Sequence, residues 1–480
     1  MKTKIILFLA LSISFINSFA QNGTIRGTIL DGENNDPVFG VTVTIEKNNT
    51  TDPNLATVVT GTMSDLDGKF TVMVPPGVYN IRFRNMSYQN LLIENVDIKA
   101  KGAQLFIGIP REQMFQENRI ALTPEAVSVL VSNGHRVMIE YLAGEGSHFT
   151  DKDYSEAGAK IAYDRKEVYQ CDILIKSAPV CEEELELLKA GQTIISPIHI
   201  AVMKPEILEG MMEKRITALS FENLKDDSGH NPIVRSMSEI AGSAVMLIAG
   251  QYLSSFNNGK GVLLGGISGI PPTKVIIIGA GIVGEYAART ALAMGGSVKV
   301  FDNNIYKLKR MQTAIGHRMW TSVVEPKILA KQLKTCDVAV GALSSIGGAR
   351  SPIVVSDEMV AAMRPGSVIV DVSIDRGGCF ETSEVTSHES PIFIKHGVIH
   401  YCVPNIPSGF ARTASTAISN VLMPLLLEIA DEGGLEKLLW HKLNIRNGIY
   451  LFKGSLTNFY LSQRFDLKYT DLNLLIASRG

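Results

Sequence analysis

The sequence predicts a multi-domain chain, with a small all-β sandwich first and an α/β body of two doubly wound lobes after it. Residues 24–102 alternate apolar and polar side chains with a period of two between short turns, which is typical of half-buried strands. From residue 105 onward, short apolar runs alternate with helical patterns, which indicates parallel sheets with crossover helices. A length of 480 residues leaves room for about two to four such domains.

The first twenty residues differ from the rest of the chain. A basic start, Met1–Lys4, precedes an apolar stretch, Ile5–Ile16, and small residues stand at Ser18 and Ala20. This pattern predicts a secretory signal peptide over residues 1–20. A buried N-terminal strand or helix is the alternative, and the pattern alone leaves it open.

Residues 24–102 contain about seven short strand-like runs separated by turn residues, which indicates a β-sandwich. The clearest runs are Thr24–Ile29, Val41–Ile45, Phe70–Val74 and Val78–Phe83. Asp65 and Asp67 suit a hairpin turn better than a calcium site, because Asp is a preferred turn residue.

This segment resembles the carboxypeptidase regulatory-like domain at Gly27, Pro37, Gly40-Val41, Thr62–Phe70 and Pro76–Tyr79. The resemblance implies a transthyretin-like sandwich of a kind common at the start of secreted and outer-membrane proteins. It implies no catalysis, so the sandwich is expected to serve as an adhesion or envelope-anchoring module that carries the body.

Composition excludes several function classes. The chain is 45% apolar and 20% charged with a formal net charge of −2, and it has no long basic patch, which argues against a nucleic-acid partner. Its five cysteines have no disulfide-scaffold pattern and no metal-ligand spacing, so no structural metal is expected. Outside the N-terminus we expect no membrane-spanning run of about 20 apolar residues.

The α/β body is expected to divide into two lobes with the ligand between them. The first lobe would comprise residues 105–232 and 412–480, and the second, dinucleotide-binding lobe residues 233–411. Strands are expected at 105–109, 136–140, 172–175, 192–195, 275–278, 298–301, 338–340 and 367–371. Helices are expected at 124–132, 154–157, 285–294 and 413–430, the last returning to the first lobe.

A glycine motif is the strongest local signal in the body. The buried-strand run Val275–Ile278 meets Gly279, Gly281 and Gly284 in G-x-G-x-x-G spacing, and Asp302 ends the next strand. These glycines permit a tight turn, a close approach to pyrophosphate and close packing of helix on strand. An acid at Asp302 suits ribose hydroxyls and repels a 2′-phosphate, so a Rossmann-like fold that binds NAD is expected. The glycines alone would also fit a turn that binds nothing.

Longer motifs identify a family. Residues 105–480 closely resemble alanine dehydrogenases, whose family also contains the NAD-binding subunit of nicotinamide nucleotide transhydrogenase. The motifs that carry this resemblance are Gly108–Glu112, Glu117–Pro124, Gly144–Gly146, Met237–Gly242, Gly261–Gly266, Val370–Glu381 and His400–Asn405. The resemblance implies reversible oxidative deamination, in which L-alanine, NAD+ and water give pyruvate, ammonium and NADH. It also implies a homo-oligomer, commonly a hexamer.

The resemblance assigns roles to individual residues. Arg119 matches the arginine that holds the substrate carboxylate, as its planar fork allows. His199 matches the histidine that donates and accepts a proton near the substrate oxygen, and Asp375 matches the acid that orients or deprotonates the attacking water. Further cofactor contacts carried over are Ser238, Lys307, Leu343 and Asn405.

The chain departs from the family at three places. Where the family has Lys-x-Lys-Glu-Pro, this chain has Lys176-Ser-Ala-Pro179, so the substrate lysine falls on Ala178. Lys176 shares a strand face with that position and is the expected substitute. Arg376 stands beside Asp375 where glutamine is usual. Glu222 matches a family acid that can lie near a metal, but Glu432 replaces its histidine partner, so no metal requirement is expected.

Two alternatives stay open. The body could bind NAD(H) without dehydrogenase activity, as in a transhydrogenase subunit, or it could act on another small amino acid. The compartment is equally unsettled, because a signal peptide implies export whereas an NAD enzyme implies the cytoplasm. Either the fusion is genuine, or two reading frames were joined near Gln104.

Overall fold

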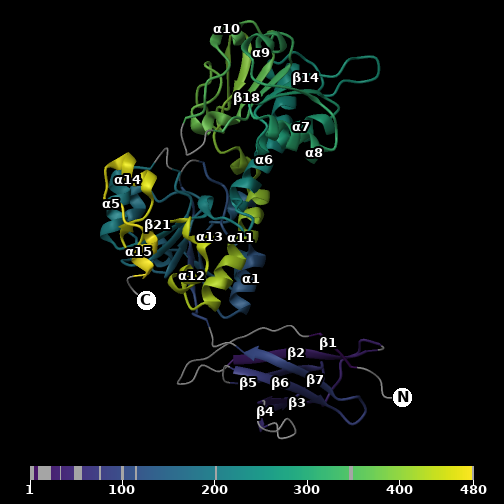
Figure 1. The fold of residues 1–480 in the computed structure, drawn as a ribbon, viewed down its shortest axis with the longest axis vertical. Coiled ribbons are helices and arrows are strands. Elements are labelled where there is room, and N and C mark those ends of the chain that lie inside the picture. The colour runs from purple at the N-terminus through teal and green to yellow at the C-terminus, as the bar shows by residue number, and fades with distance from the viewer. Residues whose placement is uncertain are drawn as a thin grey trace.

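The computed structural model describes residues 5–8, 23–32, 34–47, 57–74, 77–98, 102–113, 116–199, 203–344 and 350–477. Figure 1 shows the sandwich at one end, the first α/β lobe in the middle and the second α/β lobe at the far end. The polypeptide enters the first lobe beside the end of α11 (Ala411–Asp431), where the Ala103 N–H donates to the Ala430 carbonyl over 2.7 Å.

The N-terminal part is a two-sheet sandwich, as its turns and period-two pattern predict. One sheet has the order β1-β2-β5 and the other β4-β3-β6-β7. The strands are β1 (Ile5–Phe8), β2 (Gly23–Asp31), β3 (Thr42–Lys47), β4 (Thr57–Met63), β5 (Lys69–Val74), β6 (Gly77–Arg84) and β7 (Leu91–Ile98). Ile25, Ile45 and Phe83 are fully buried between the sheets. Asp65 accepts hydrogen bonds from the Asp67 and Lys69 N–H groups, which is the turn use expected of it.

The predicted signal peptide lies almost wholly outside the described residues. Its described part, β1, runs antiparallel to β2 and pairs Ile5 with Asp31.

The first α/β lobe is built on an eight-stranded sheet with the order β10-β9-β8-β11-β12-β13-β21-β22. Its strands are β8 (Phe106–Ile109), β9 (Arg136–Glu140), β10 (Lys160–Ala162), β11 (Ile173–Ile175), β12 (Thr193–Ser196), β13 (Thr217–Ser220), β21 (Ile449–Phe452) and β22 (Ser455–Leu456). Strands β8 to β13 are mutually parallel, and β21 adds antiparallel to β13. The C-terminal segment thus completes the sheet that the first segment begins.

Helices cover that sheet. They are α1 (Pro124–Ser132), α2 (Asp151–Glu156), α3 (Arg165–Val168), α4 (Glu182–Leu185), α5 (Pro205–Glu213), α12 (Leu435–His441), α13 (Leu443–Arg446), α14 (Phe459–Phe465) and α15 (Leu472–Ala477). Helix α1 has the bounds that the sequence predicts; Thr123 caps it and Pro124 occupies its first turn.

The second α/β lobe is built on a seven-stranded sheet with the order β16-β15-β14-β17-β18-β20-β19. The strands are β14 (Lys274–Ile278), β15 (Ser297–Phe301), β16 (Trp320–Ser322), β17 (Val338–Gly341), β18 (Val368–Asp371), β19 (Ile392–Lys395) and β20 (Val398–Tyr401). All are parallel except β19. Its helices are α7 (Ile282–Ala293), α8 (Ile305–Ile315), α9 (Pro326–Leu333) and α10 (Asp357–Ala361).

Two long helices join the lobes. Helix α6 (Pro232–Leu253) begins against the first lobe's core at Ile233 and ends in the second lobe's core at Leu253. Helix α11 follows the short 3-10 helix η6 (Ile406–Phe410) and runs back into the first core, as expected of the segment 413–430.

Helix α6 and the segment Ile406–Asp431, which contains α11, are long and apolar enough to cross a membrane by length and composition alone. The sequence reading expected no such segment. Core helices of soluble proteins pass the same test, and both helices contribute buried residues to the α/β cores.

Candidate functional site

The glycine turn has the space a dinucleotide needs. Gly279 has a φ of +115°, and a side-chain carbon there would lie 2.3 Å from the Ala342 carbonyl oxygen. At Gly284 such a carbon would lie 1.9 Å from the Gly279 carbonyl oxygen, so helix and strand pack too closely for any side chain. Gly281 instead faces open space at the start of α7. The unpaired N–H groups and positive dipole end of a helix start suit a pyrophosphate there.

Asp302 follows β15, at the position where ribose hydroxyls are expected. Its Oδ2 accepts from the Ala280 N–H over 2.7 Å, and its Oδ1 accepts from the Asn304 N–H over 2.7 Å. The carboxylate therefore fixes the glycine turn, and each oxygen retains acceptor capacity for a sugar hydroxyl. These residues fit a dinucleotide, on the evidence of the glycine spacing and of this acid.

The other expected cofactor residues stand at four separate places in the chain. Lys307 is half-buried in the first turn of α8. Leu343 follows β17, and its N–H donates to Ser373 Oγ over 3.0 Å. Ser238 is half-buried on α6, and Asn405 lies between β20 and η6 with a φ of +54°.

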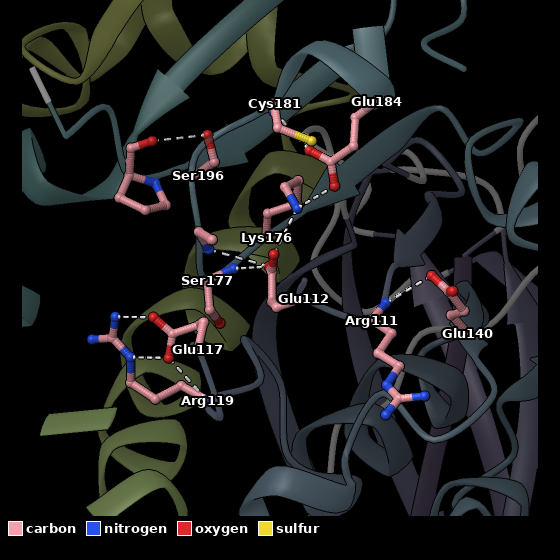
Figure 2. A network of polar contacts seen from close by, with 12 residues as sticks. Arg111, Glu112, Glu117, Arg119, Glu140, Lys176, Ser177, Cys181, Glu184 and Ser196 are labelled. Carbon is pink, nitrogen blue, oxygen red and sulfur yellow. Dashed lines mark hydrogen bonds and ion pairs between the residues drawn. The ribbon is translucent and has the colours of Figure 1, made fainter. Parts of the chain in front are cut away.

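Arg119 is buried, with 7% of its surface exposed, before α1. Its Nε donates to Glu117 Oε1 over 2.7 Å, and its Nη2 pairs with Glu117 Oε2. Its Nη1 contacts Met237 Sδ on α6 at 3.3 Å. Figure 2 shows the guanidinium and the Glu117 carboxylate meeting edge to edge. The arginine is thus held in one orientation before any substrate arrives.

His199 follows β12 in the left-handed region, with a φ of +44°. Its ring Nε2 lies 3.5 Å from Glu222 Oε1, and Glu222 Oε2 accepts from the Ile198 N–H over 3.1 Å. The ring retains solvent contact, since 41% of its side chain is exposed. Glu222 therefore both orients the loop and supplies a carboxylate to the imidazole.

Asp375 lies in a 3-10 turn, η5 (Val372–Arg376), directly after β18. It retains solvent contact, yet desolvation by the surrounding protein raises the pKa of Asp375. The Asn405 N–H, which donates to Asp375 Oδ1 over 3.1 Å, opposes that shift, as do the charges of His199, Arg119 and Arg376. A carboxyl with a raised pKa is a better proton acceptor than an ordinary surface aspartate.

The same interactions show which predicted residues come together. Arg119 and His199 lie close enough to Asp375 for their charges to act on it, although the three follow different strands of two sheets. Asn405 joins the group through its bond to Asp375 and through its Nδ2, which donates to Glu117 Oε2 over 3.0 Å. The strand ends of both lobes therefore assemble one site from an arginine, an imidazole and an acid.

Lys176 lies apart from that group. It is 1% exposed, and its Nζ is 2.6 Å from Glu112 Oε2 and 2.8 Å from Glu184 Oε1. Burial opposes its charge, but the two carboxylates outweigh burial and raise the pKa of Lys176. In Figure 2 the ammonium points to Glu112 and Glu184, and Arg119 with Glu117 lies at a separate place. Lys176 was expected to substitute for the family lysine. Its ammonium instead forms ion pairs with Glu112 and Glu184.

Two further residues, Glu112 and Glu117, were not predicted from the sequence as part of the site. Glu112 Oε1 accepts from the Ser177 and Ala178 N–H groups, over 2.5 and 3.2 Å, and so holds the loop where the family has its lysine. Glu117 holds Arg119. Both stand inside the quoted motifs, but their partners could not be read from spacing because the Glu112 bond to Lys176 spans 64 residues.

Asp371 was also missed as a functional residue. Its carboxylate is 1% exposed and accepts from the Ser373 N–H, the Cys379 N–H and the Ser383 hydroxyl. These bonds close the loop that carries Asp375. Among the described residues, no group of three or more His, Cys, Asp or Glu side chains is arranged to hold a metal ion.

Family comparisons match almost the whole chain. The carboxypeptidase regulatory-like domain matches residues 24–105. The N-terminal domain of the alanine dehydrogenase/PNT family matches residues 108–241, and its C-terminal domain matches residues 244–459.

Individual relatives agree. An alanine dehydrogenase of Methanococcus maripaludis is 39% identical over 368 residues, which are 76% of this chain and 98% of that protein. Alanine dehydrogenase 2 of Staphylococcus aureus is 36% identical over 76% of this chain and 97% of its own. A solved L-alanine dehydrogenase superposes with a TM-score of 0.71 at 34% identity, covering 75% of this chain and 99% of that one. A transhydrogenase from Sinorhizobium meliloti, 22% identical with a TM-score of 0.64, covers 74% of this chain and 99% of its own and shares the fold.

Proposed function

Because the chain belongs to the alanine dehydrogenase/PNT family, we propose that it is an NAD-dependent alanine dehydrogenase in which Arg119, His199 and Asp375 handle the substrate. The reaction converts L-alanine and water to pyruvate and ammonium, and it is reversible. The observation that supports the proposal is that the charges of Arg119 and His199, from the first lobe, act on Asp375. Asp375 follows a strand of the same sheet that carries the glycine turn, which fits a dinucleotide.

Arg119 binds the carboxylate. An arginine presents five N–H donors in a planar fork, and contacts among the described residues use three of them, two to Glu117 and one to Met237. Two donors remain, which is the number a bidentate carboxylate contact needs. Glu117 fixes the fork beforehand, so little side-chain entropy is lost when substrate binds.

When bound, NAD+ would be held by the glycine turn and Asp302 and would accept the hydride of the alanine Cα–H. Water would then add to the oxidised carbon of the substrate. Asp375 accepts the proton of that water, for which its raised pKa suits it. As the carbonyl forms, the His199 imidazole passes the hydroxyl proton of the water adduct to the departing nitrogen, so that ammonia leaves. In reverse it returns that proton to the substrate oxygen, and Glu222 holds the ring beside that step.

Lys176 acts on the site indirectly, through Glu112. It neutralises Glu112 and Glu184, and Glu112 in turn holds the Ser177 and Ala178 backbone against the site. Its contribution to substrate binding is therefore the shape of that loop. Without the family ammonium at Ala178, we expect a higher KM for the carboxylate substrate than a lysine-containing relative would have.

The enzyme is a homo-oligomer in this proposal, hexameric by family resemblance. A groove of about 400 Å³ lies between α6, α7 and α11, and its lining includes Leu247, which is 53% exposed, and Phe410. Exposed apolar surface on these helices supports association of subunits. We also propose that residues 1–20 act as a signal peptide for export. Fractionation of cells, with detection of the peptide across residues 95–115, tests this.

The direct test follows NADH formation by the purified full-length chain with L-alanine and NAD+. We expect turnover that requires both substrates, and loss of at least about 100-fold of the rate in the Asp375→Asn variant. Absence of NADH formation, with NADH binding retained, would select the alternative of a dinucleotide-binding module without dehydrogenase activity. Turnover with another small amino acid but not with alanine would instead identify that amino acid as the substrate.

A further inference from the structure

Glu117 has a carboxylate whose acceptor positions are all used. Its side chain is 2% exposed, and it accepts four hydrogen bonds. Three come from Arg119, through the backbone N–H at 2.9 Å, through Nε at 2.7 Å and through Nη2. The fourth comes from Asn405 Nδ2 at 3.0 Å. A carboxylate has about four acceptor positions, so no position is left over for a substrate.

These bonds join the two lobes. Arg119 and Glu117 precede α1 of the first lobe, whereas Asn405 follows β20 of the second lobe and donates its own N–H to Asp375. Two neighbouring contacts reinforce the junction, since Ser408 Oγ donates to the Gln116 carbonyl over 2.9 Å and accepts from the Asn118 N–H over 3.0 Å. A continuous chain of contacts therefore runs Arg119–Glu117–Asn405–Asp375.

We propose that Glu117 is a positioning residue that couples the substrate arginine of the first lobe to Asn405 and the acid of the second lobe. It holds the guanidinium along its Nε edge, which leaves two N–H groups for the substrate carboxylate. It also holds Asn405 at the junction, so that the arginine takes its working orientation only when the lobes are docked as they are here. This role rests on the proposed dehydrogenase function.

The charge of Glu117 is essential to this role. Burial opposes ionisation, but the charge and hydrogen bonds of Arg119 outweigh it and lower the pKa of Glu117. Glutamine would keep the size of the side chain but not its pairing. Its amide has one oxygen, and its NH2 group would face the donors of Arg119 or Asn405. The Glu117→Gln variant therefore releases both the arginine and the lobe junction.

A matched pair elsewhere in the chain supplies the control. Glu46 is 3% exposed and binds Arg82 with the same edge-on geometry, through Nε at 2.7 Å and Nη2 at 2.9 Å. This pair lies in the sandwich, away from the site. The Glu46→Gln variant loses the same kind of ion pair and should leave kcat and both KM values unchanged.

The experiment measures kinetics and binding in the full-length wild type, Glu117→Gln, Glu117→Asp and Glu46→Gln. We expect Glu117→Gln to raise the KM for pyruvate and for L-alanine by about 10- to 100-fold, with a smaller change in the affinity for NADH. Aspartate, which keeps the charge, should recover part of the loss. In an Arg119→Lys background the Glu117→Gln change should add little, because its effect passes through the arginine.

A folded Glu117→Gln variant, judged by an unchanged thermal midpoint and unchanged NADH binding, with KM values within twofold of wild type would overturn the coupling role. Equal losses in Glu117→Gln and Glu46→Gln would overturn it too. Calorimetric binding of pyruvate to the NADH complex gives the same comparison without turnover. A wild type that binds pyruvate but forms no product would reject the dehydrogenase, while the binding data still decide the role of Glu117.

Discussion

The loops that follow β11 and β18 are held in place by different kinds of interaction. The site needs both loops, and each is held by a buried carboxylate that accepts backbone N–H groups. At β18 this carboxylate is Asp371, which serves neutral donors from its own loop, the farthest only 12 residues away. At β11 it is Glu112, which comes from 64 residues earlier and is paired with Lys176.

The difference lies in charge. Glu112, Lys176 and Glu184 are all buried, and Arg165 and the Tyr169 hydroxyl also bind Glu184. Burial raises the pKa of Glu112, and the nearby Glu184 carboxylate adds to that shift, so that the neighbouring Lys176 ammonium is outweighed. The first lobe therefore depends on balanced buried charges, whereas the second lobe depends on short-range hydrogen bonds. Substitutions that break the ion pairs and substitutions that break the hydrogen bonds should therefore change stability and activity differently.

Removing the ammonium should have the largest effect. The Lys176→Met variant leaves the buried Glu112 without its cation and Glu184 with Arg165 alone. Breaking one side of a buried pair costs about 3–5 kcal/mol. We expect that loss in the free energy of unfolding measured with urea. A Lys176→Met/Glu184→Gln double variant should recover part of it. An unchanged midpoint for the single variant would mean that the charges are not coupled as described.

Restoring the family ammonium tests the same loop from the other side. The Ala178→Lys variant places a cation at the position where the family has its substrate-binding lysine. A preorganised charged donor there is worth on the order of 3 kcal/mol in the transition state. We expect kcat/KM for pyruvate to rise by up to about 100-fold in initial-rate measurements. Ala178 is 2% exposed, so an unchanged unfolding midpoint is the condition for interpreting the result. A folded variant with lower kcat/KM would show that the loop is built around the small side chain.

Weakening the loop after β18 should lower the free energy of unfolding by less than removing the Lys176 ammonium does. The Asp371→Asn variant keeps the shape of the side chain but replaces one accepting oxygen by a donor that faces backbone N–H groups. The loss should be about 1–3 kcal/mol of unfolding free energy, together with a lower kcat because Asp375 is less well placed. Urea unfolding and initial rates measure both. The matched Ser383→Ala change removes only one of these bonds, to Asp371 Oδ2, and should give the smaller effect.

The smallest and most gradual effect is expected from the titration of Asp375, which should make kcat/KM depend on pH. Its raised pKa means that a larger fraction of this carboxyl is protonated at mildly acidic pH than in an ordinary aspartate. Since the proposed role needs the carboxylate, kcat/KM for L-alanine should fall as pH drops, by about tenfold per unit below that pKa. A pH–rate profile of wild type against Arg376→Gln sharpens the point. Loss of the neighbouring cation should move the acidic limb to higher pH.

The sequence foretold most of the fold for a physical reason. Period-two alternation, buried apolar runs and glycine spacing are local, and they correctly indicated the sandwich, β14 with its turn, and the return of α11. Helix α7 begins at Ile282, three residues before the expected start, because the helix takes up the glycine turn itself. β22 is a short strand at a sheet edge that no pattern in the sequence pointed to. β1 falls where the sequence left an N-terminal strand open as the alternative to a signal peptide.

The site was predictable only in part. Arg119, His199 and Asp375 came from motif resemblance, and their approach to one another requires contacts between strand ends of two sheets. Glu117 was visible in a motif, but its link to Asn405 spans 288 residues. For Lys176, strand periodicity put its side chain on the face of Ala178, yet Glu112 and Glu184 determine where the ammonium points.

The most direct test of the account is a crystal structure of the full-length protein with NADH and pyruvate. The account predicts the pyruvate carboxylate on Arg119, its 2-oxo oxygen against His199, and Asp375 on the side where water enters. The nicotinamide should face the 2-carbon from the second lobe, with Glu117 still bound to Arg119 and Asn405. Pyruvate bound away from Arg119, or a nicotinamide turned away from these three side chains, would contradict it.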